Sequence, residues 1–241
     1  MVKLRLAALF SGGKDSTYAA HLASLLGHDI VYLLTMLPAR DDSWMFHTVN
    51  IGLAPLVAQA LGIESVVVET SGEKEEELQD LKPAIAGLNV DGLVTGAIAS
   101  TYQRSRVDGI CSELEIEHVA PLWGRESSEL VTEMIANGMS IIITAVAAMG
   151  LDEKWLGRTL DGDALMELKS LSERYGVDVC GEGGEMETLV LDAPWFESRL
   201  ELLRTRSEWE GVRGSYIVEE ARLILKDGPA SSTSWTRASN L

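Results

Sequence analysis

The first half of the chain alternates short apolar runs with segments of helical period. The run at 4–10 is almost continuously apolar, which indicates a buried strand, and a glycine turn follows it. The turn leads into a predicted helix whose apolar face carries Tyr18, Leu22, Leu25 and Leu26. Further strands are predicted at 30–36, 65–69, 92–95 and 118–120. Further helices are predicted at 53–61, 73–88 and 102–114.

Strands that alternate with helices imply an α/β fold with a parallel sheet and right-handed crossovers. Such sheets bind their ligands at the carboxyl ends of the strands. The segments with candidate chemistry in this half follow the strands at 4–10, 30–36 and 92–95. The pattern therefore predicts a five-stranded parallel sheet with a ligand site at one edge.

The pattern changes after Trp123. Two helices are predicted there, at 127–137 and 162–174. The predicted strands are 139–146, 177–180, 189–191, 200–203 and 216–225. This order predicts a smaller α+β domain at 124–226, after a first domain at 1–123. The tail at 227–241 is rich in Ser, Thr, Gly and Pro, and we expect it to be disordered.

The composition excludes several classes of binding partner. The chain has 37 Asp and Glu residues against 20 Lys and Arg, a net charge of -17, which repels phosphate backbones. We therefore expect no nucleic-acid partner. Cys111 and Cys180 lie far apart and form no CxxC pair, so we expect no zinc site built on paired thiolates. The apolar runs are too short for a membrane span of roughly 20 residues or for a signal peptide, and a cytoplasmic enzyme without a membrane partner is predicted.

The strongest local signal is the segment Ser11–Ser16, with the sequence SGGKDS, between a predicted strand and a predicted helix. Glycines let the backbone approach an anion closely, and the amide groups at a helix N-terminus bind phosphate. Lys14 adds a charge for the phosphates, and Asp15 either holds Mg²⁺ or orients the loop. A plain glycine turn with a serine cap is the alternative. The segment is not a Walker A loop, but its position after a strand favours phosphate binding.

This loop resembles the PP-loop of the ATP pyrophosphatase superfamily, whose members have a sheet of the adenine-nucleotide alpha-hydrolase (HUP) type. They cleave ATP to AMP and pyrophosphate and activate a carbonyl or carboxylate as its adenylate. Three further segments narrow the field: SWMFH at 43–47, GAI with YQRSR and PLW between 96 and 123, and GEGGEMETLVLDAP at 181–194. Together with the loop they are similar to the diphthine–ammonia ligase family, over roughly 4–225. The family more often has an aromatic residue where this chain has Met186.

The resemblance implies that ATP, with Mg²⁺, adenylylates the carboxylate of a trimethylated histidine side chain on translation elongation factor 2. Ammonia then attacks the acyl-adenylate. The residues expected to bind ATP are Ser11, Gly12, Gly13, Lys14, Asp15, Ser16, Thr35, Met36, Gly96, Ala97 and Ile98. Those expected to act in catalysis are Lys14, Asp15, Arg104, Arg106 and Glu185, with Asp15 as the metal ligand. Those expected to bind the protein substrate are His47, Tyr102, Gln103, Trp123, Glu182, Gly183, Gly184, Glu185, Glu187 and Thr188.

Several of these roles leave alternatives open. Arg104 and Arg106 neutralise the α-phosphate, or they lie on a solvated helix face. His47 contacts the nucleotide or the substrate, or it is structural. The glutamates at 182–187 bind Mg²⁺, attract ammonium, or cradle the trimethylammonium group with help from an aromatic face at Trp123 or Trp195. An acidic loop in an acidic protein is the plainer interpretation of these glutamates.

Two other functions compete. A tRNA-thiolating enzyme of the same superfamily needs a sulfur-carrying cysteine and a basic surface, and only Cys180 fits the first requirement. A non-catalytic ATP-sensing module of the universal-stress type shares the sheet architecture, but it needs neither the Lys14–Ser16 run nor the glutamate segment. The sequence leaves the oligomeric state open, a homodimer included.

Overall fold

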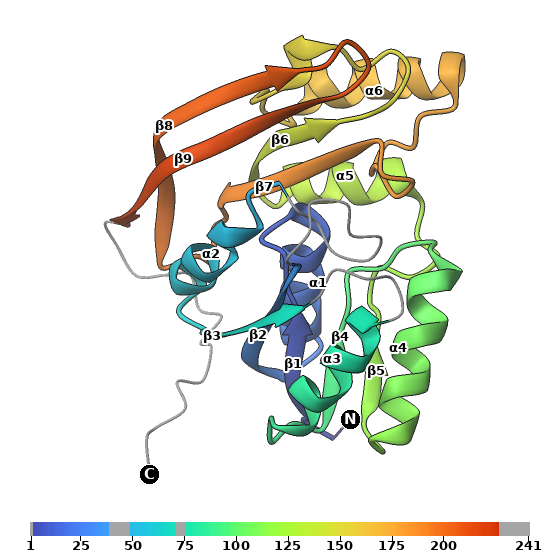
Figure 1. Ribbon diagram of the computed structural model, residues 1–241, viewed down its shortest axis with the longest axis vertical. Helices are drawn as coiled ribbons and strands as arrows, with labels where there is room; N and C mark the ends of the chain where they lie inside the picture. Colours follow the sequence, from blue (N-terminus) through green and yellow to red (C-terminus); the bar gives the residue numbers. More distant parts are fainter. Residues whose placement is uncertain (1, 39–48, 71–75, 227–241) are drawn as a thin grey trace.

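The computed structural model describes residues 2–38, 49–70 and 76–226, and its first half contains a five-stranded parallel sheet (Figure 1). The strands are β1 (Arg5–Leu9), β2 (Asp29–Pro38), β3 (Glu64–Thr70), β4 (Gly92–Val94) and β5 (Glu117–Val119). They lie in the order β3-β2-β1-β4-β5, and every neighbouring pair is parallel. The predicted parallel sheet is confirmed, with strand ends that differ by one or two residues.

Helices cover both faces of this sheet. They are α1 (Lys14–Leu25), α2 (Ala54–Leu61), α3 (Glu76–Ala86) and α4 (Thr101–Glu113), with a 3-10 turn, η1 (Ile51–Leu53), before α2. Successive strand residues point to opposite faces, so Leu33 packs in the core beside α1 and α2 while Leu34 packs beside α3 and α4. The sheet is therefore buried on both sides, as parallel sheets require.

The predicted apolar face of α1 is wrong at its C-terminal end, because Leu25 and Leu26 are exposed. The helix instead buries small residues, including Ala19, Ala20 and Ala23. The sheet packs on one side of α1 and the second half of the chain on another, so no single stripe faces the core. Small side chains let the backbones approach closely on both sides.

The strand order places a switch point beside β1. The chain first builds outward through β2 and β3, then crosses over β1 to add β4 and β5 on the other side (Figure 1). Loops that follow β1 and β4 therefore leave the sheet in different directions and open a crevice at the carboxyl ends of the strands. This crevice is where the segment Ser11–Ser16 lies.

The second half forms a four-stranded antiparallel sheet in the order β7-β6-β9-β8, so the predicted α+β arrangement is confirmed. Its strands are β6 (Ser140–Val146), β7 (Met186–Asp192), β8 (Ser198–Trp209) and β9 (Gly214–Leu225). Its helices are α5 (Ser127–Ala136) and α6 (Gly162–Tyr175), with a 3-10 turn, η2 (Glu153–Trp155), between β6 and α6.

Two predicted strands of this half need correction. The segment 177–180 is irregular, because the Asp178 carboxylate accepts the backbone N–H groups of Cys180 and Glu182 and so replaces strand pairing by a local turn. Strand β8 is three times as long as the predicted run at 200–203. Its charged residues pair across the hairpin, as Arg204 does with Glu219, and this polar sequence hides the strand pattern.

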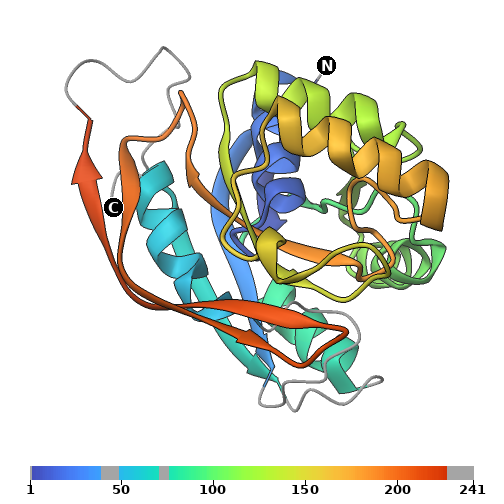
Figure 2. The ribbon, with the colours of Figure 1, turned by 90° about the horizontal axis from the view of Figure 1, so that it is seen from above.

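The two halves share one hydrophobic core. Residues of α1 and α2 pack in the same cluster as residues of α5, α6, β6 and β7 (Figure 2). Strand β7 contacts α1, and β8 contacts α2. The boundary near Trp123 stays a prediction, and the tail at 227–241 lies outside the described residues. Within the described ranges, none of the helices has the length and apolar character needed to cross a membrane.

Candidate active site

The segment Ser11–Ser16 forms a closed loop at the N-terminus of α1. Gly12 has a φ of 76°, in the left-handed region that favours glycine. Ser16 Oγ accepts the Ser11 N–H at 3.3 Å and lies 3.2 Å from the Gly13 carbonyl, to which its hydroxyl donates. Ser11 Oγ accepts the Gly13 N–H at 3.3 Å. The two serines therefore hold the loop in shape and leave the first turn of α1 facing the crevice.

Strand β7 fastens this loop from the second half of the chain. The Val190 N–H donates to the Gly12 carbonyl at 3.0 Å, and the Lys14 N–H donates to Thr188 Oγ1 at 3.1 Å. These contacts join residues about 175 positions apart in the sequence. The phosphate loop is therefore built by both halves of the chain.

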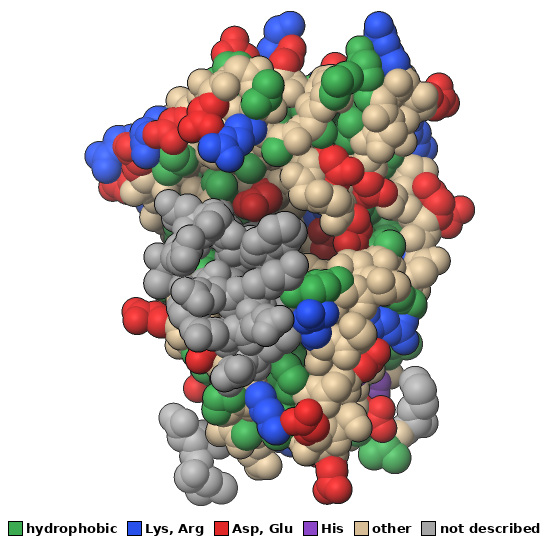
Figure 3. All heavy atoms as spheres, turned by 45° about the vertical axis from the view of Figure 1, so that its right-hand side comes forward, with side chains coloured by type: hydrophobic (Ala, Val, Ile, Leu, Met, Phe, Trp, Pro, Cys, Tyr) green, Lys and Arg blue, Asp and Glu red, His purple; other side chains and the backbone are tan. Residues whose placement is uncertain are grey.

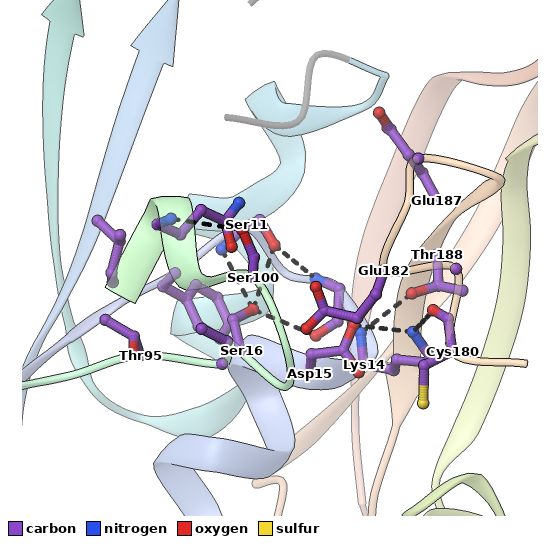
Figure 4. Close-up of a pocket in the computed structure, with 18 of the residues that line it drawn as sticks. Ser11, Lys14, Asp15, Ser16, Thr95, Ser100, Cys180, Glu182, Glu187 and Thr188 are labelled. Atoms are coloured by element: carbon purple, nitrogen blue, oxygen red, sulfur yellow. Dashed lines mark hydrogen bonds and ion pairs between the residues drawn. The ribbon is translucent and has the colours of Figure 1, made fainter. Parts of the chain in front are cut away.

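Lys14 is buried, with 1% of its side chain exposed, and its ammonium group is held in place. Its Nζ lies 2.8 Å from Asp15 Oδ2 and 2.5 Å from the Cys180 carbonyl (Figure 4). Burial by itself lowers the pKa of Lys14, but the neighbouring Asp15 and Cys180 outweigh burial and the pKa lies above its ordinary value. Lys14 is therefore a fixed positive charge beneath the loop.

The other oxygen of Asp15 has no such partner. Asp15 Oδ1 is buried and makes no hydrogen bond to any described residue. A buried carboxylate oxygen without a partner is costly unless a ligand or an ion meets it.

A cavity of about 390 Å³ opens beside these residues, within the range of small-molecule sites. The phosphate loop and the start of α4 form one wall, and the segment 180–188 forms the other. Acidic side chains gather around the recess between the two halves (Figure 3). The cavity is lined by Leu9, Phe10, Ser11, Gly13, Lys14, Asp15, Ser16, Met36, Ile51, Thr95, Gly96, Ala97, Ser100, Tyr102, Gln103, Val107, Cys180, Gly181, Glu182, Gly183, Gly184, Met186, Glu187 and Thr188.

The loop between β4 and α4 lies directly on the N-terminus of α1. A Cβ at Gly96 would stand 2.8 Å from both the Asp15 carbonyl carbon and the Ser16 nitrogen, so only glycine fits this approach. Glu182 Oε1 accepts the N–H groups of Ile98 at 2.5 Å and Ala99 at 3.1 Å. Burial raises the pKa of Glu182, and the two N–H donors oppose that rise.

Comparison with known proteins gives the family of a chain with this site. Residues 4–118 match the diphthamide synthase N-terminal domain, and residues 126–224 match the diphthamide synthase C-terminal domain. The chain belongs to the diphthamide synthase family. The family predicted from the sequence motifs is thereby confirmed.

Several diphthine–ammonia ligases are similar to this diphthamide synthase family member. The protein of Danio rerio is 39% identical over 219 residues, which cover 82% of this chain and 86% of that protein. The protein of Homo sapiens is 39% identical over 222 residues, which cover 82% of each. The protein of Schizosaccharomyces pombe is 31% identical over 246 residues, which cover 94% of this chain and 40% of that longer protein.

Most residues predicted for the site of this diphthamide synthase family member do line the cavity, but seven described ones do not: Gly12, Thr35, Ile98, Arg104, Arg106, Trp123 and Glu185. Gly12 and Ile98 shape the loops instead. The Thr35 hydroxyl donates to the Phe10 carbonyl at 2.9 Å and so supports the chain just before the phosphate loop. His47 lies outside the described residues.

Neither candidate arginine lines the cavity, and both stack on aromatic rings: Arg104 on Trp123, which is outside the cavity wall, and Arg106 on Tyr102, which is part of it. The Arg104 guanidinium lies 4.4 Å from the centroid of the Trp123 ring, and that of Arg106 lies 3.4 Å from the Tyr102 centroid. Their role at the α-phosphate stays a prediction that this geometry does not support. Neither tryptophan offers an aromatic face in the cavity wall, because Trp123 carries Arg104 and the buried Trp195 stacks on His21 at 3.6 Å.

The three glutamates of the segment 181–188 point in different directions. Glu185 accepts the N–H groups of Gly183 at 2.7 Å and Asp178 at 3.3 Å, so its carboxylate organises its own turn. Glu187 lines the cavity and points away from Lys14 and Asp15 (Figure 4). Glu182 holds the loop after β4. In the part of the chain that the structure describes, no group of three or more His, Cys, Asp or Glu side chains is placed to hold a metal.

Thr95 and Ser100 also line the cavity, although neither is among the residues predicted from the sequence. Thr95 Oγ1 lies 2.8 Å from His118 Nε2, and His118 Nδ1 lies 2.6 Å from Asp108 Oδ1. Ser100 caps α4 by accepting the Gln103 N–H at 3.3 Å. Thr95 is the last residue of the strand predicted at 92–95 and Ser100 follows it, so their position at the carboxyl edge of the sheet was the available signal.

Cys180 contributes its carbonyl group rather than its thiol. The thiol is buried and donates to the Ser127 carbonyl at 3.2 Å, and burial raises its pKa to about 12. A thiol in this state is not a nucleophile near neutral pH. The geometry therefore speaks against a thiolating reaction that uses Cys180 as the sulfur carrier.

Proposed function

We propose that this chain is a diphthine–ammonia ligase, which uses ATP and ammonia to amidate the diphthine carboxylate on translation elongation factor 2. The products are diphthamide, AMP and pyrophosphate. The observation that carries this proposal is the match of both halves of the chain to the two domains of one family, over 4–118 and 126–224. Relatives that bear the name diphthine–ammonia ligase are similar over most of the chain.

The reaction divides into two substitutions. In the first, a carboxylate oxygen of diphthine forms a bond to the α-phosphorus of ATP, and pyrophosphate leaves with the electrons of the broken P–O bond. In the second, the ammonia nitrogen forms a bond to the acyl carbon, AMP leaves, and the nitrogen loses a proton to solvent. Formation of an activated acyl group makes the second substitution easier than direct displacement of hydroxide.

The residues of the phosphate loop supply binding and charge for the first step. The N-terminus of α1 attracts the negative phosphates, and Lys14 adds a positive charge that is already oriented before ATP binds.

Asp15 fits a Mg²⁺ ion that accompanies ATP. Its Oδ1 is buried and lacks a hydrogen-bond partner among the described residues, while Oδ2 orients Lys14. Mg²⁺ is commonly held by one or two carboxylates together with substrate phosphates. Such an ion, when bound, neutralises charge on the leaving pyrophosphate.

The proposal is tested with elongation factor 2 purified from cells that lack this activity, so that its diphthine is not amidated. The assay measures ATP-dependent pyrophosphate release and incorporation of isotope-labelled ammonium into the factor by mass spectrometry. We expect both for the wild type, and a loss of at least about 100-fold in turnover for Lys14→Ala and Asp15→Asn. Lys154→Ala, at an exposed position, is the matched control and should keep wild-type turnover. Pyrophosphate release without labelled nitrogen in the factor, or full turnover in Lys14→Ala, would contradict the proposal.

A further inference from the structure

Glu182 connects the two halves of the chain across the cavity. It lies in the turn that precedes β7, and its Oε1 accepts the backbone N–H groups of Ile98 and Ala99, which are 84 and 83 positions away. Consecutive N–H groups that point the same way form a concave site for an anion. Here the anion is a side chain of the same protein, which comes from the opposite wall of the cavity (Figure 4).

The turn that carries Glu182 is itself held at several points. Asp178 Oδ1 accepts the Glu182 N–H at 3.3 Å and the Cys180 N–H at 2.8 Å. The Gly184 N–H closes the turn on the Gly181 carbonyl at 3.0 Å. The Glu182 carboxylate therefore starts from a fixed backbone, and it can fix the loop that it contacts.

Among the described residues, the backbone of the loop after β4 makes few other hydrogen bonds. Strand β4 has three residues, and beyond it the Thr95 N–H donates to the Val119 carbonyl at 3.0 Å. The Ile98 carbonyl accepts the Gly124 N–H at 2.8 Å on the side away from Glu182. This loop carries Gly96 and Ala97, which line the cavity, and Gly96 lies on the backbone of Asp15 and Ser16. A displaced loop would change both the cavity wall and the first turn of α1.

We infer that Glu182 is a positioning residue for the nucleotide site, which acts through the backbone of Ile98 and Ala99 rather than by contact with a cationic substrate. The inference rests on the proposed function, because it assigns the cavity to ATP. It makes the second half of the chain a structural part of the ATP site. This role requires an acceptor oxygen within hydrogen-bonding distance of the two N–H groups, and the negative charge of the side chain is secondary.

Three substitutions separate these two properties. Glu182→Gln keeps an oxygen in the place of Oε1 without the charge, Glu182→Asp keeps the charge but is one carbon shorter, and Glu182→Ala has neither. The dissociation constant for ATP is measured directly by equilibrium dialysis, and KM and kcat come from the amidation assay. We expect Glu182→Gln to stay within about threefold of the wild type, because its amide oxygen still accepts both N–H groups. We expect Glu182→Asp and Glu182→Ala to weaken ATP binding roughly 10- to 100-fold.

Glu173→Ala on the exposed side of α6 is the control, and it should bind ATP like the wild type. Circular dichroism checks the fold, and if Glu182→Ala does not fold, the comparison of Gln with Asp still decides. A Gln variant as weak as the Ala variant, with Asp near wild type, would mean that the charge matters and would overturn the inference. An ATP affinity equal to that of the wild type in all three variants would also overturn the inference. The proposed function would still stand in that case, because it depends on amidation by the wild type. A wild type that binds no ATP would refute the proposed function and this role together.

Discussion

Replacement of Gly96 by alanine tests whether the loop after β4 must lie on the N-terminus of α1. The added Cβ would stand 2.8 Å from the Asp15 carbonyl carbon and the Ser16 nitrogen, and 3.0 Å from the Asp15 oxygen. All three are backbone atoms, which no rotamer change can move aside. Favourable contact begins at about 3.5 Å, so the loop has to shift by roughly 0.7 Å.

Such overpacking costs about 1–3 kcal/mol, which corresponds to roughly a 5- to 150-fold loss of affinity if the strain falls on the bound loop. Gly109→Ala in α4 is the matched control. Among the described residues, no atom outside the backbone of its own helix and its two chain neighbours lies within 4 Å of its added Cβ. The change should therefore stabilise an exposed helix interior by about 1 kcal/mol. The assays are urea unfolding and the dissociation constant for ATP. Wild-type ATP affinity together with a wild-type free energy of unfolding in Gly96→Ala would refute the steric argument.

Two further predictions concern groups beneath the site. Thr188→Val keeps the shape of the side chain but leaves the Lys14 N–H without its acceptor. We expect it to lower the free energy of unfolding by about 1–3 kcal/mol. Thr132→Val, at an exposed position of α5, is the near-neutral control. The second prediction concerns His21, whose pKa burial lowers to about 4. Between this pH and about 6.5 the unfolded chain therefore binds more protons than the native one. The free energy of unfolding should fall as the pH drops through this window. In urea unfolding, we expect His21 to lower the free energy of unfolding of the wild type by roughly 2 kcal/mol at pH 5 relative to pH 7.5. His21→Phe keeps a ring against Trp195 and should remove this loss. An equal pH dependence of the free energy of unfolding in both proteins would contradict the low pKa of His21.

The glutamate segment shows where prediction from the sequence stopped. Its glycines and carboxylates marked it as part of the site, and Glu182 and Glu187 do line the cavity. The sequence left the partners of each carboxylate open, because they lie on other elements or on the turn itself. In the structure, Glu182 accepts a hydrogen bond from the loop after β4, and Glu185 accepts one from its own turn. The stacking of Arg104 on Trp123 was hidden for the same reason.

The sequence by itself determined the parallel sheet, the turn at Ser11–Ser16 and the family. Apolar periodicity, glycine positions and the start of a helix depend on neighbours a few residues away, so they can be read along the chain. Only the tertiary structure decided that β7 closes the phosphate loop and that Lys14 is tied to Asp15 and the Cys180 carbonyl. The contacts of Lys14 with Thr188 and with the Cys180 carbonyl join residues 174 and 166 positions apart, and they arise from how the second half packs against α1. Side-chain direction at the crevice follows from that packing, which no local pattern encodes.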